Sequence, residues 1–319
     1  MLENLSAPSH VRQRGAAVLV LLLVVFIAAT TIFLKQSNAV SIRGQADLVT
    51  TRAMAQAKEA LIGRAATDSN APGSLPCPNI NGDGTAPLFS GSQCPAYIGR
   101  LPWKTLHLPE PLDGNGDALW YALSPGVRDK TSAPHPVNPQ IALELTLGGT
   151  PNIAAIIFSP GAPLASQNGR PSNAVADYLD GSNSDGDYNY VTGPASANFN
   201  DKALAITRDE LFRTVNQRVL GEIRGQTPSY GLRHYFADNG YFPWFDSGND
   251  GYGDIGTTSG NVPYNDFGID PATLVWLNLN GWLPLLGYQR LSSYSVKIGI
   301  TGSGSSMDVV MPCPSPPCP

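Results

Sequence analysis

"RQRGAAVLVLLLVVFIAATTIFLKQ", residues 12–36, decides how the N-terminal part of the chain is interpreted. Two arginines and a glycine stand before an uncharged apolar run, residues 16–34, and a lysine follows it. The run has about the length that a helix needs to cross a bilayer core of about 30 Å. Because basic residues mark the cytoplasmic side of membrane helices, we expect a membrane helix with a cytoplasmic tail and an exported body.

Three kinds of processing are compatible with this stretch. A secretory peptidase would cut after the run, a plain signal anchor would stay uncut, and a prepilin peptidase would cut between Gly15 and Ala16. The run exceeds the about 7 to 15 apolar residues of a signal peptide, and Phe33, Leu34 and Lys35 stand where a small-x-small cleavage site would be expected. Removal after the run is therefore not expected, and the other two outcomes remain open.

The helical pattern continues beyond the apolar run. Apolar residues recur at steps of three or four with polar residues between them, which is typical of one face of a helix; they are Ala39, Ile42, Ala46, Val49, Ala53, Ala57 and Leu61. We therefore expect one helix from Ala16 to about Ala66, on the order of 75 Å long at 1.5 Å per residue. Its first half would lie in the membrane and its second half would be amphipathic.

Composition fits an exported body and excludes a nucleic-acid footprint. Charged residues make up 14% of the chain, the net charge is -5, and 33 glycines and 28 prolines are present. No basic face or lysine run is found, so no nucleic-acid partner is expected. No H-E-x-x-H, G-x-S-x-G, P-loop or dinucleotide motif occurs. We therefore expect that the protein is not an enzyme and has no cofactor.

The four cysteines, Cys77, Cys94, Cys313 and Cys318, all follow the apolar run. In an oxidising compartment an even number of cysteines indicates disulfides. Three pairings are possible, and proximity in sequence favours Cys77 with Cys94 and Cys313 with Cys318. A zinc site is the alternative, but neither a C-x-x-C motif nor a nearby histidine supports it.

One loop offers candidate calcium ligands. Asn79, Asn81 and Asp83 are followed by Gly84, which matches the alternating oxygen ligands at the start of an EF-hand-like loop. The twelfth position is Ser90, so the bidentate glutamate of that loop is absent. Calcium is thus one hypothesis, and ordinary solvated turns are the other explanation for this loop and for the remaining acidic, glycine-rich loops.

The body of the chain predicts both helix and strand. Thr207 and Glu210 have capping-box spacing and open a helix expected from about Arg208 towards Phe236. The segments 141–147, 152–159 and 294–300 are expected to form short strands. We divide the chain into a leader (1–15), an N-terminal helix (16–66), a first head region (67–205) and a second head region with helix and strands (206–319).

Several segments resemble a known family. The basic leader ending in Gly15, the apolar run, and the segments "EALIGRAATDSNAPGSLPCPNINGDG", "GRLPWKTL", "DGNGDALWYALSP", "YLDGSNSDGDYNYV" and "FNDKALAITRDELF" are similar to type IV prepilins and type II secretion pseudopilins. The resemblance implies cleavage between Gly15 and Ala16 and methylation of the new Ala16 amine. It also implies an α+β fold with a long N-terminal pilin-like helix, its membrane half followed by an amphipathic half. This helix would pack on a Gly/Pro-rich globular head with short antiparallel strands.

One departure from the family suggests a specialised role. Most major pilins carry glutamate at the fifth mature position, where this chain has Val20. A buried glutamate can pair with the N-terminal amine of a neighbouring subunit, since a charge in an apolar core needs a partner. A subunit at the filament tip would not need to supply that carboxylate. The resemblance therefore favours a minor, tip-associated pilin or pseudopilin.

The resemblance also implies partners and a location. The expected partners are a prepilin peptidase, other pilin or pseudopilin subunits and an inner-membrane assembly platform. The expected location is the bacterial inner membrane, crossed once with the head in the periplasm, and then a pilus or pseudopilus at the cell surface. The alternative is a membrane-tethered extracytoplasmic binding protein or adhesin that is not assembled into a filament.

Overall fold

The computed structural model describes residues 14–89, 92–129, 135–225, 229–257 and 259–312, with side chains of residues 14–19 and 31–42 left out. The chain falls into two compact units, residues 1–49 and 50–319. The helix α1 (Arg14–Thr67) contributes to both. It ends one residue after the predicted limit at Ala66.

The membrane-spanning half predicted for residues 16–34 is corrected by the structure. Among the residues that are described, no helix contains a segment long and apolar enough to cross a membrane. The absence of a membrane-crossing segment among the described residues also corrects two further predictions. These are the fold class with a pilin-like membrane helix and the single-pass location in the inner membrane.

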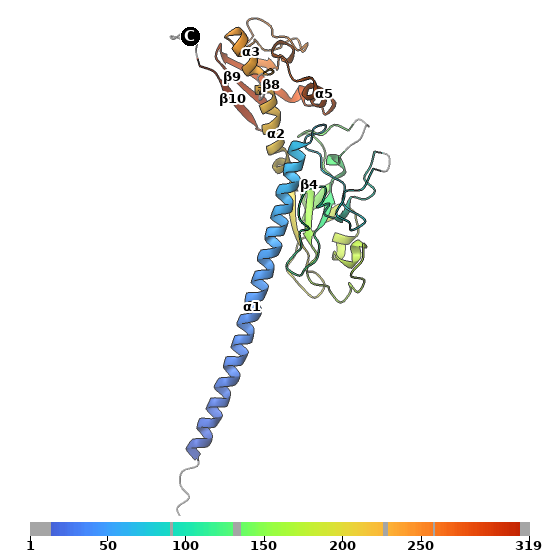
Figure 1. The fold of residues 1–319 in the computed structure, drawn as a ribbon, viewed down its shortest axis with the longest axis vertical. Coiled ribbons are helices and arrows are strands. Elements are labelled where there is room, and N and C mark those ends of the chain that lie inside the picture. The colour runs from blue at the N-terminus through green and yellow to red at the C-terminus, as the bar shows by residue number, and fades with distance from the viewer. Residues whose placement is uncertain (1–13, 90–91, 130–134, 226–228, 258, 313–319) are drawn as a thin grey trace, which may run out of the picture. The chain divides into compact units, whose positions relative to one another are not determined.

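The second unit combines short helices with two sheets (Figure 1). Its remaining helices are α2 (Arg208–Arg224), α3 (Leu232–Asn239), α4 (Tyr264–Phe267), α5 (Pro271–Leu279) and the 3-10 turns η1 (Pro125–Val127), η2 (Val175–Asp177), η3 (Gly181–Ser184) and η4 (Leu283–Leu285). Its strands are β1 (Ile98–Arg100), β2 (Trp120–Leu123), β3 (Leu145–Leu147), β4 (Thr150–Ser159), β5 (Asn189–Tyr190), β6 (Lys202–Thr207), β7 (Ser259–Asn261), β8 (Leu286–Ser292), β9 (Ser295–Ile300) and β10 (Ser306–Val310).

The first sheet has the order β1-β2-β4-β3-β5, and β6 also pairs with β4. All pairs are antiparallel except β3 with β5, which run parallel, so the sheet is mixed rather than purely antiparallel as expected. Strand β4 is the central element, and its last seven residues are all buried. Burial on both faces explains why its sequence reads as a continuous apolar run instead of an alternation.

Two groups of side chains cover the two faces of this sheet. Tyr121 and Ile157 belong to the main core, whereas Trp120 and Phe158 pack with Tyr178 in a smaller core. Neighbours along each strand therefore point in opposite directions, as the two-residue period of a strand requires.

The second sheet has the order β10-β9-β8-β7 and is antiparallel throughout. Val296, Ile298 and Ile300 alternate along β9 and are buried in the main core, while Lys297 between them is exposed. Apolar residues of α2 belong to the same core, among them Leu211, Val215 and Val219. The core of the second unit thus includes residues of both sheets and of α2.

The helix expected over residues 208–236 is two helices. The capping box is confirmed, since Thr207 accepts from the Glu210 backbone N–H and Glu210 accepts from that of Thr207. The helix α2 then ends at Arg224, and the next residue, Gly225, caps it with φ +95. A Cβ at Gly225 or Gly231 would overlap the backbone of the other segment. The chain therefore turns through a close glycine contact before α3 begins.

Candidate functional site

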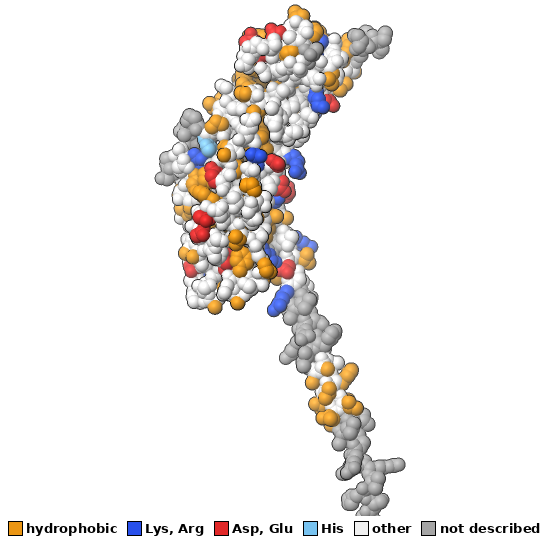
Figure 2. Space-filling model, turned by 180° about the vertical axis from the view of Figure 1, so that it is seen from behind, with side chains coloured by type: hydrophobic (Ala, Val, Ile, Leu, Met, Phe, Trp, Pro, Cys, Tyr) orange, Lys and Arg blue, Asp and Glu red, His pale blue; other side chains and the backbone are white. Residues whose placement is uncertain are grey.

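The described N-terminal part of α1 carries apolar side chains at eight consecutive positions, which surround the helix and are exposed (Figure 2). These residues are called the exposed row below. All eight residues from Val20 to Ile27 are large and apolar, and their exposed fractions lie between 52% and 69%. Gly15 and Ala16 lie in the first turn of α1, and the structure describes only their backbone. Val20, at the position where most major pilins carry a glutamate, belongs to the exposed row.

The other end of α1 is fixed in the second unit. Small residues of this end are buried in the core, including Ala57 and Ala65 at 0% exposure. Lys58 Nζ donates to Ala205 O and pairs with Glu210 Oε1 at 2.8 Å. Arg218 Nη1 donates to the carbonyls of Ala66 and Asp68, at the C-terminal end of the helix. Because these carbonyls have no partner within the helix, the arginine serves as a cap.

The expected disulfide between Cys77 and Cys94 is present, with a Cα–Cα distance of 5.5 Å. Both cysteines are buried, so the link lies in the core beneath the loop that it closes. Cys313 and Cys318 lie outside the described residues, and their pairing stays a prediction.

Two of the calcium candidates, Asn79 and Asp83, contact each other, and Asn79 does so through its amide NH2 group, which is not a metal ligand. The Asn79 amide Nδ2 donates to Asp83 Oδ1 at 2.5 Å and to Thr85 O at 2.6 Å. The Thr85 backbone N–H donates to the same Asp83 oxygen, and the Asn81 carbonyl accepts from Asn173. In the described parts of the chain, no group of three or more His, Cys, Asp or Glu residues could hold a metal ion. The loop is held by its own hydrogen bonds.

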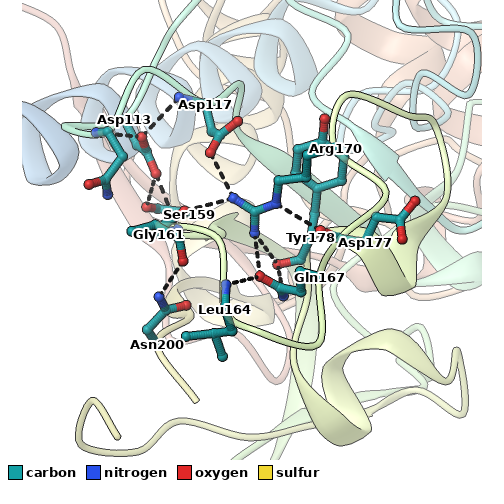
Figure 3. A network of polar contacts seen from close by, with 12 residues as sticks. Asp113, Asp117, Ser159, Gly161, Leu164, Gln167, Arg170, Asp177, Tyr178 and Asn200 are labelled. Carbon is teal, nitrogen blue, oxygen red and sulfur yellow. Dashed lines mark hydrogen bonds and ion pairs between the residues drawn. The ribbon is translucent and has the colours of Figure 1, made fainter. Parts of the chain in front are cut away.

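The most extensive polar site is built around Arg170 (Figure 3). Its side chain is only 8% exposed and pairs with Asp117 Oδ2 at 2.7 Å. Nη1 also donates to Gly161 O, and Nε donates to Asp177 O. Nη2 donates to Gln167 Oε1 and to the Tyr178 carbonyl. These contacts use all five N–H groups of the guanidinium, so the site fastens the irregular segment after β4 and leaves no donor for a ligand.

Asp113 is a second centre in the same network. Its Oδ2 accepts from Ser159 Oγ at 2.7 Å, at the end of β4, and its Oδ1 accepts from the backbone N–H groups of Asn115 and Asp117. Burial raises the pKa of Asp117, opposed by the neighbouring positive charge of Arg170. Asp113 therefore ties the turn at residues 113–117, just before β2, to the end of β4.

A buried pair of carboxyl groups lies between the segments around 180 and 200. Both Asp180 and Asp201 are 4% exposed. Asp180 accepts from Gln167 Nε2 and from the Asn200 backbone N–H, one on each oxygen. Asp201 Oδ2 accepts from the Asp180 N–H and from Asn183 Nδ2, whereas its Oδ1 has no donor. Burial raises the pKa of Asp201 to about 7, and the negative charge of Asp180 adds to this.

The sequence did not identify these residues. The sequence predicts solvated turns for the acidic, glycine-rich loops that hold Asp113, Asp180 and Asp246, but each of these aspartates is at most 4% exposed and accepts backbone N–H groups. A single signal was available, namely that these aspartates precede Gly or Ser in loops, where a carboxylate can satisfy the backbone of the following residues.

No protein-family model matches this chain, and no curated protein or solved structure gives a significant match.

Proposed function

We propose that the protein is a minor subunit of a filament of the type IV pilus or type II secretion pseudopilus class, placed at or near the tip. The observation that carries the proposal is the row of exposed apolar side chains along α1, residues 20–27, on a helix whose far end is buried in a folded unit. The sequence resemblance of the leader and of the head segments supports the same assignment.

The exposed row is a surface that requires a partner. Burying a large apolar side chain fully stabilises by about 1.5 to 3 kcal/mol, and these eight residues are exposed by slightly more than half. Covering the row against other helices would therefore contribute on the order of 10 kcal/mol. Contiguous apolar surface of this kind is typical of an interaction site.

The partners follow from this role. Other pilin or pseudopilin subunits would supply the facing helices, a prepilin peptidase would release Ala16 as the mature N-terminus, and an assembly platform would bring the subunits together. Because this chain has Val20 at that position, it supplies no carboxylate to pair with the N-terminal amine of a neighbouring subunit. The chain would therefore occupy a place in the filament, such as the tip, where no neighbour needs this ion pair.

Processing and assembly can be tested separately. N-terminal sequencing of the protein purified from its host should find Ala16 as the first residue, and Gly15→Leu should retain the leader. Capture of the tagged protein should co-purify pilin subunits identified by mass spectrometry. A first residue at Met1 in the assembled protein, or well after Leu34, would contradict the proposal.

A matched pair of variants isolates the role of the helix. Val24→Lys places a charge in the exposed row and should abolish co-purification of subunits, because a buried lysine would have no partner. Leu88→Lys makes the same kind of change at a side chain that is 91% exposed elsewhere and should leave it intact. Equal loss in both variants would show that the row has no special role.

A further inference from the structure

The second sheet has one strand edge that the described residues leave uncovered. Strand β10 pairs only with β9, so its other side is the outer edge of the sheet (Figure 1). The residues that flank β10, Ser305 and Met311, form backbone hydrogen bonds with Ile300 and Tyr294 on the β9 side. Hydrogen-bonded positions alternate along an antiparallel pair, so every second residue of β10 turns its backbone N–H and C=O groups away from the sheet. These residues are Ser306, Asp308 and Val310.

Three other strand edges of the second unit are covered. Asn79 pairs with the last residue of β1, and Asp246 exchanges backbone hydrogen bonds with Asn261 of β7. On β6 the Ala205 carbonyl accepts from Lys58 Nζ. The outward backbone groups of β10 make no hydrogen bond within the described residues, and the three residues that carry them are exposed. Such a row of unpaired backbone groups is a template for an added strand.

A shallow groove of about 430 Å³ crosses the exposed face of this sheet and reaches β10. Ser306, Gly299 and Gly287 stand side by side in its floor, on β10, β9 and β8. A Cβ at Gly287 would meet only the Gly299 carbonyl oxygen, at 4.0 Å, so the space above the glycines is open. Neighbouring strands lie about 4.8 Å apart. An aromatic side chain on an added strand would therefore pass over Ser306 and reach Gly299.

The same face sets a charge preference at the edge. Asp308 stands opposite Lys297 of β9, and both side chains are exposed. An added strand would place one residue opposite Asp308 on its other side, where a basic side chain is favourable and an acidic one is not. With β10 of a second copy as the added strand, the antiparallel register that pairs all three open residues would set Asp308 against Asp308. A basic segment of another protein is therefore the better occupant.

We propose that the outer edge of β10 receives an extended segment of another protein as an added antiparallel strand. The segment carries a basic residue opposite Asp308 and, two positions later, an aromatic residue opposite Ser306. Its backbone pairs with the outward N–H and C=O groups of β10 and provides affinity, and the two side chains provide specificity. This edge lies in the second unit and contains no residue of the exposed row.

Fluorescence anisotropy with the purified full-length chain tests the proposal. The probes are three labelled peptides of about ten residues, rich in threonine because it favours extended chains. The first has a lysine and, two positions later, a phenylalanine; the second has glutamate for the lysine, and the third has alanine for the phenylalanine. The first should bind, and the other two should each bind about fivefold more weakly, the scale of one cross-strand pair.

Matched variants separate the backbone, the charge and the groove. Val310→Pro removes an outward N–H and keeps the bonds to β9, so it should weaken binding at least about fivefold, whereas Val310→Ala should bind like wild type. Asp308→Lys should reverse the preference, so that the glutamate peptide binds better than the lysine peptide. Gly299→Val should weaken binding of the phenylalanine peptide, and Gly287→Val, one strand farther from the edge, should not.

Absence of binding of the first peptide, or equal affinity for all three, would overturn the proposal. An unchanged preference in Asp308→Lys would overturn it as well, and this variant changes only an exposed side chain, so it remains informative if the proline variant unfolds. A dimer of the wild-type chain that Val310→Pro abolishes would show that a second copy occupies the edge and would also overturn the proposal. Equal losses in Gly299→Val and Gly287→Val would contradict the part assigned to the aromatic residue.

Discussion

Replacing Asp201 by asparagine should stabilise the protein above neutral pH and have little effect in acid. The Asp180 carboxylate already accepts one donor on each oxygen, so its buried neighbour Asp201 is favoured in the protonated form. Burial, with the Asp180 charge added, raises the Asp201 pKa to about 7 from the ordinary value of 3.8. Asparagine is neutral at every pH and keeps an oxygen for the donors from Asp180 and Asn183.

The sign follows from proton uptake. Between about pH 4 and 7 the folded chain holds a proton on Asp201 that the unfolded chain releases, so the free energy of unfolding falls as the pH rises. Above pH 7 both states are ionised and the folded state carries the whole cost. Raising the pKa of Asp201 from 3.8 to about 7 corresponds to on the order of 4 kcal/mol. This is the largest increase in the free energy of unfolding to be expected from Asp201→Asn at pH 8.

Urea unfolding of wild type and variant from pH 4 to pH 8 measures the difference. Other carboxyl groups titrate in both proteins and cancel in that difference. Glu110→Gln is the control, because Glu110 is exposed and makes no hydrogen bond or ion pair within the described residues; it should give a difference close to zero at every pH. A difference between wild type and Asp201→Asn that does not grow with pH, or a variant less stable at pH 8, would refute the reasoning.

Three further changes probe the scaffold by thermal or urea unfolding. Arg170→Met should cost about 3 to 5 kcal/mol, because it leaves the partly buried Asp117 carboxylate without its ion-pair partner; a loss below about 1 kcal/mol would show that the network is dispensable. Gly84→Ala should cost at least about 1 kcal/mol, since Gly84 has φ +80 and a Cβ would overlap the Trp103 indole; an unchanged midpoint would contradict this. Reduction of the Cys77–Cys94 link, whose ends are 17 residues apart, should cost about 3 kcal/mol, checked against the double serine variant, and an equal stability of both redox forms would be the opposite result.

The sequence predicted those elements whose signal is local. The capping residues Thr207 and Glu210 form the box that their spacing indicated. The apolar segments at 141–147 and 294–300 contain β3 and β9, and the segment 152–159 covers all of β4 except its first two residues. The pairing of Cys77 with Cys94 also agreed with proximity along the chain.

Two errors came from interactions that are not local. The apolar periodicity after Arg208 continued to Phe236, but Gly225 and Gly231 meet in a turn that no helical pattern reveals. The parallel pairing of β3 with β5 joins residues more than forty positions apart, as in the pair Thr146 and Asn189. Such a contact depends on how the intervening segment folds, and that segment is held by Arg170 and its partners.

The buried polar residues show why composition alone could not locate the sites. Asp113, Asp180 and Arg170 stand in glycine-rich loops that have the composition of solvated turns. Irregular backbone exposes many N–H and C=O groups, and when such backbone is covered these groups need partners. Carboxylates and one arginine supply them here, so the charges stabilise loop geometry in place of regular secondary structure.

The two described ends of α1 differ in side-chain size, and this difference bears on where partners bind. Alanines such as Ala57 and Ala65 are fully buried, because small side chains let the helix approach the packed residues of its own unit closely. From Val20 to Ile27 the side chains are large and exposed, and the net gain from covering them depends on a facing surface of comparable extent. In the described part of the second unit, by contrast, the large exposed apolar side chains lie singly or in pairs along the chain. The proposed assembly should therefore depend on the row at residues 20–27.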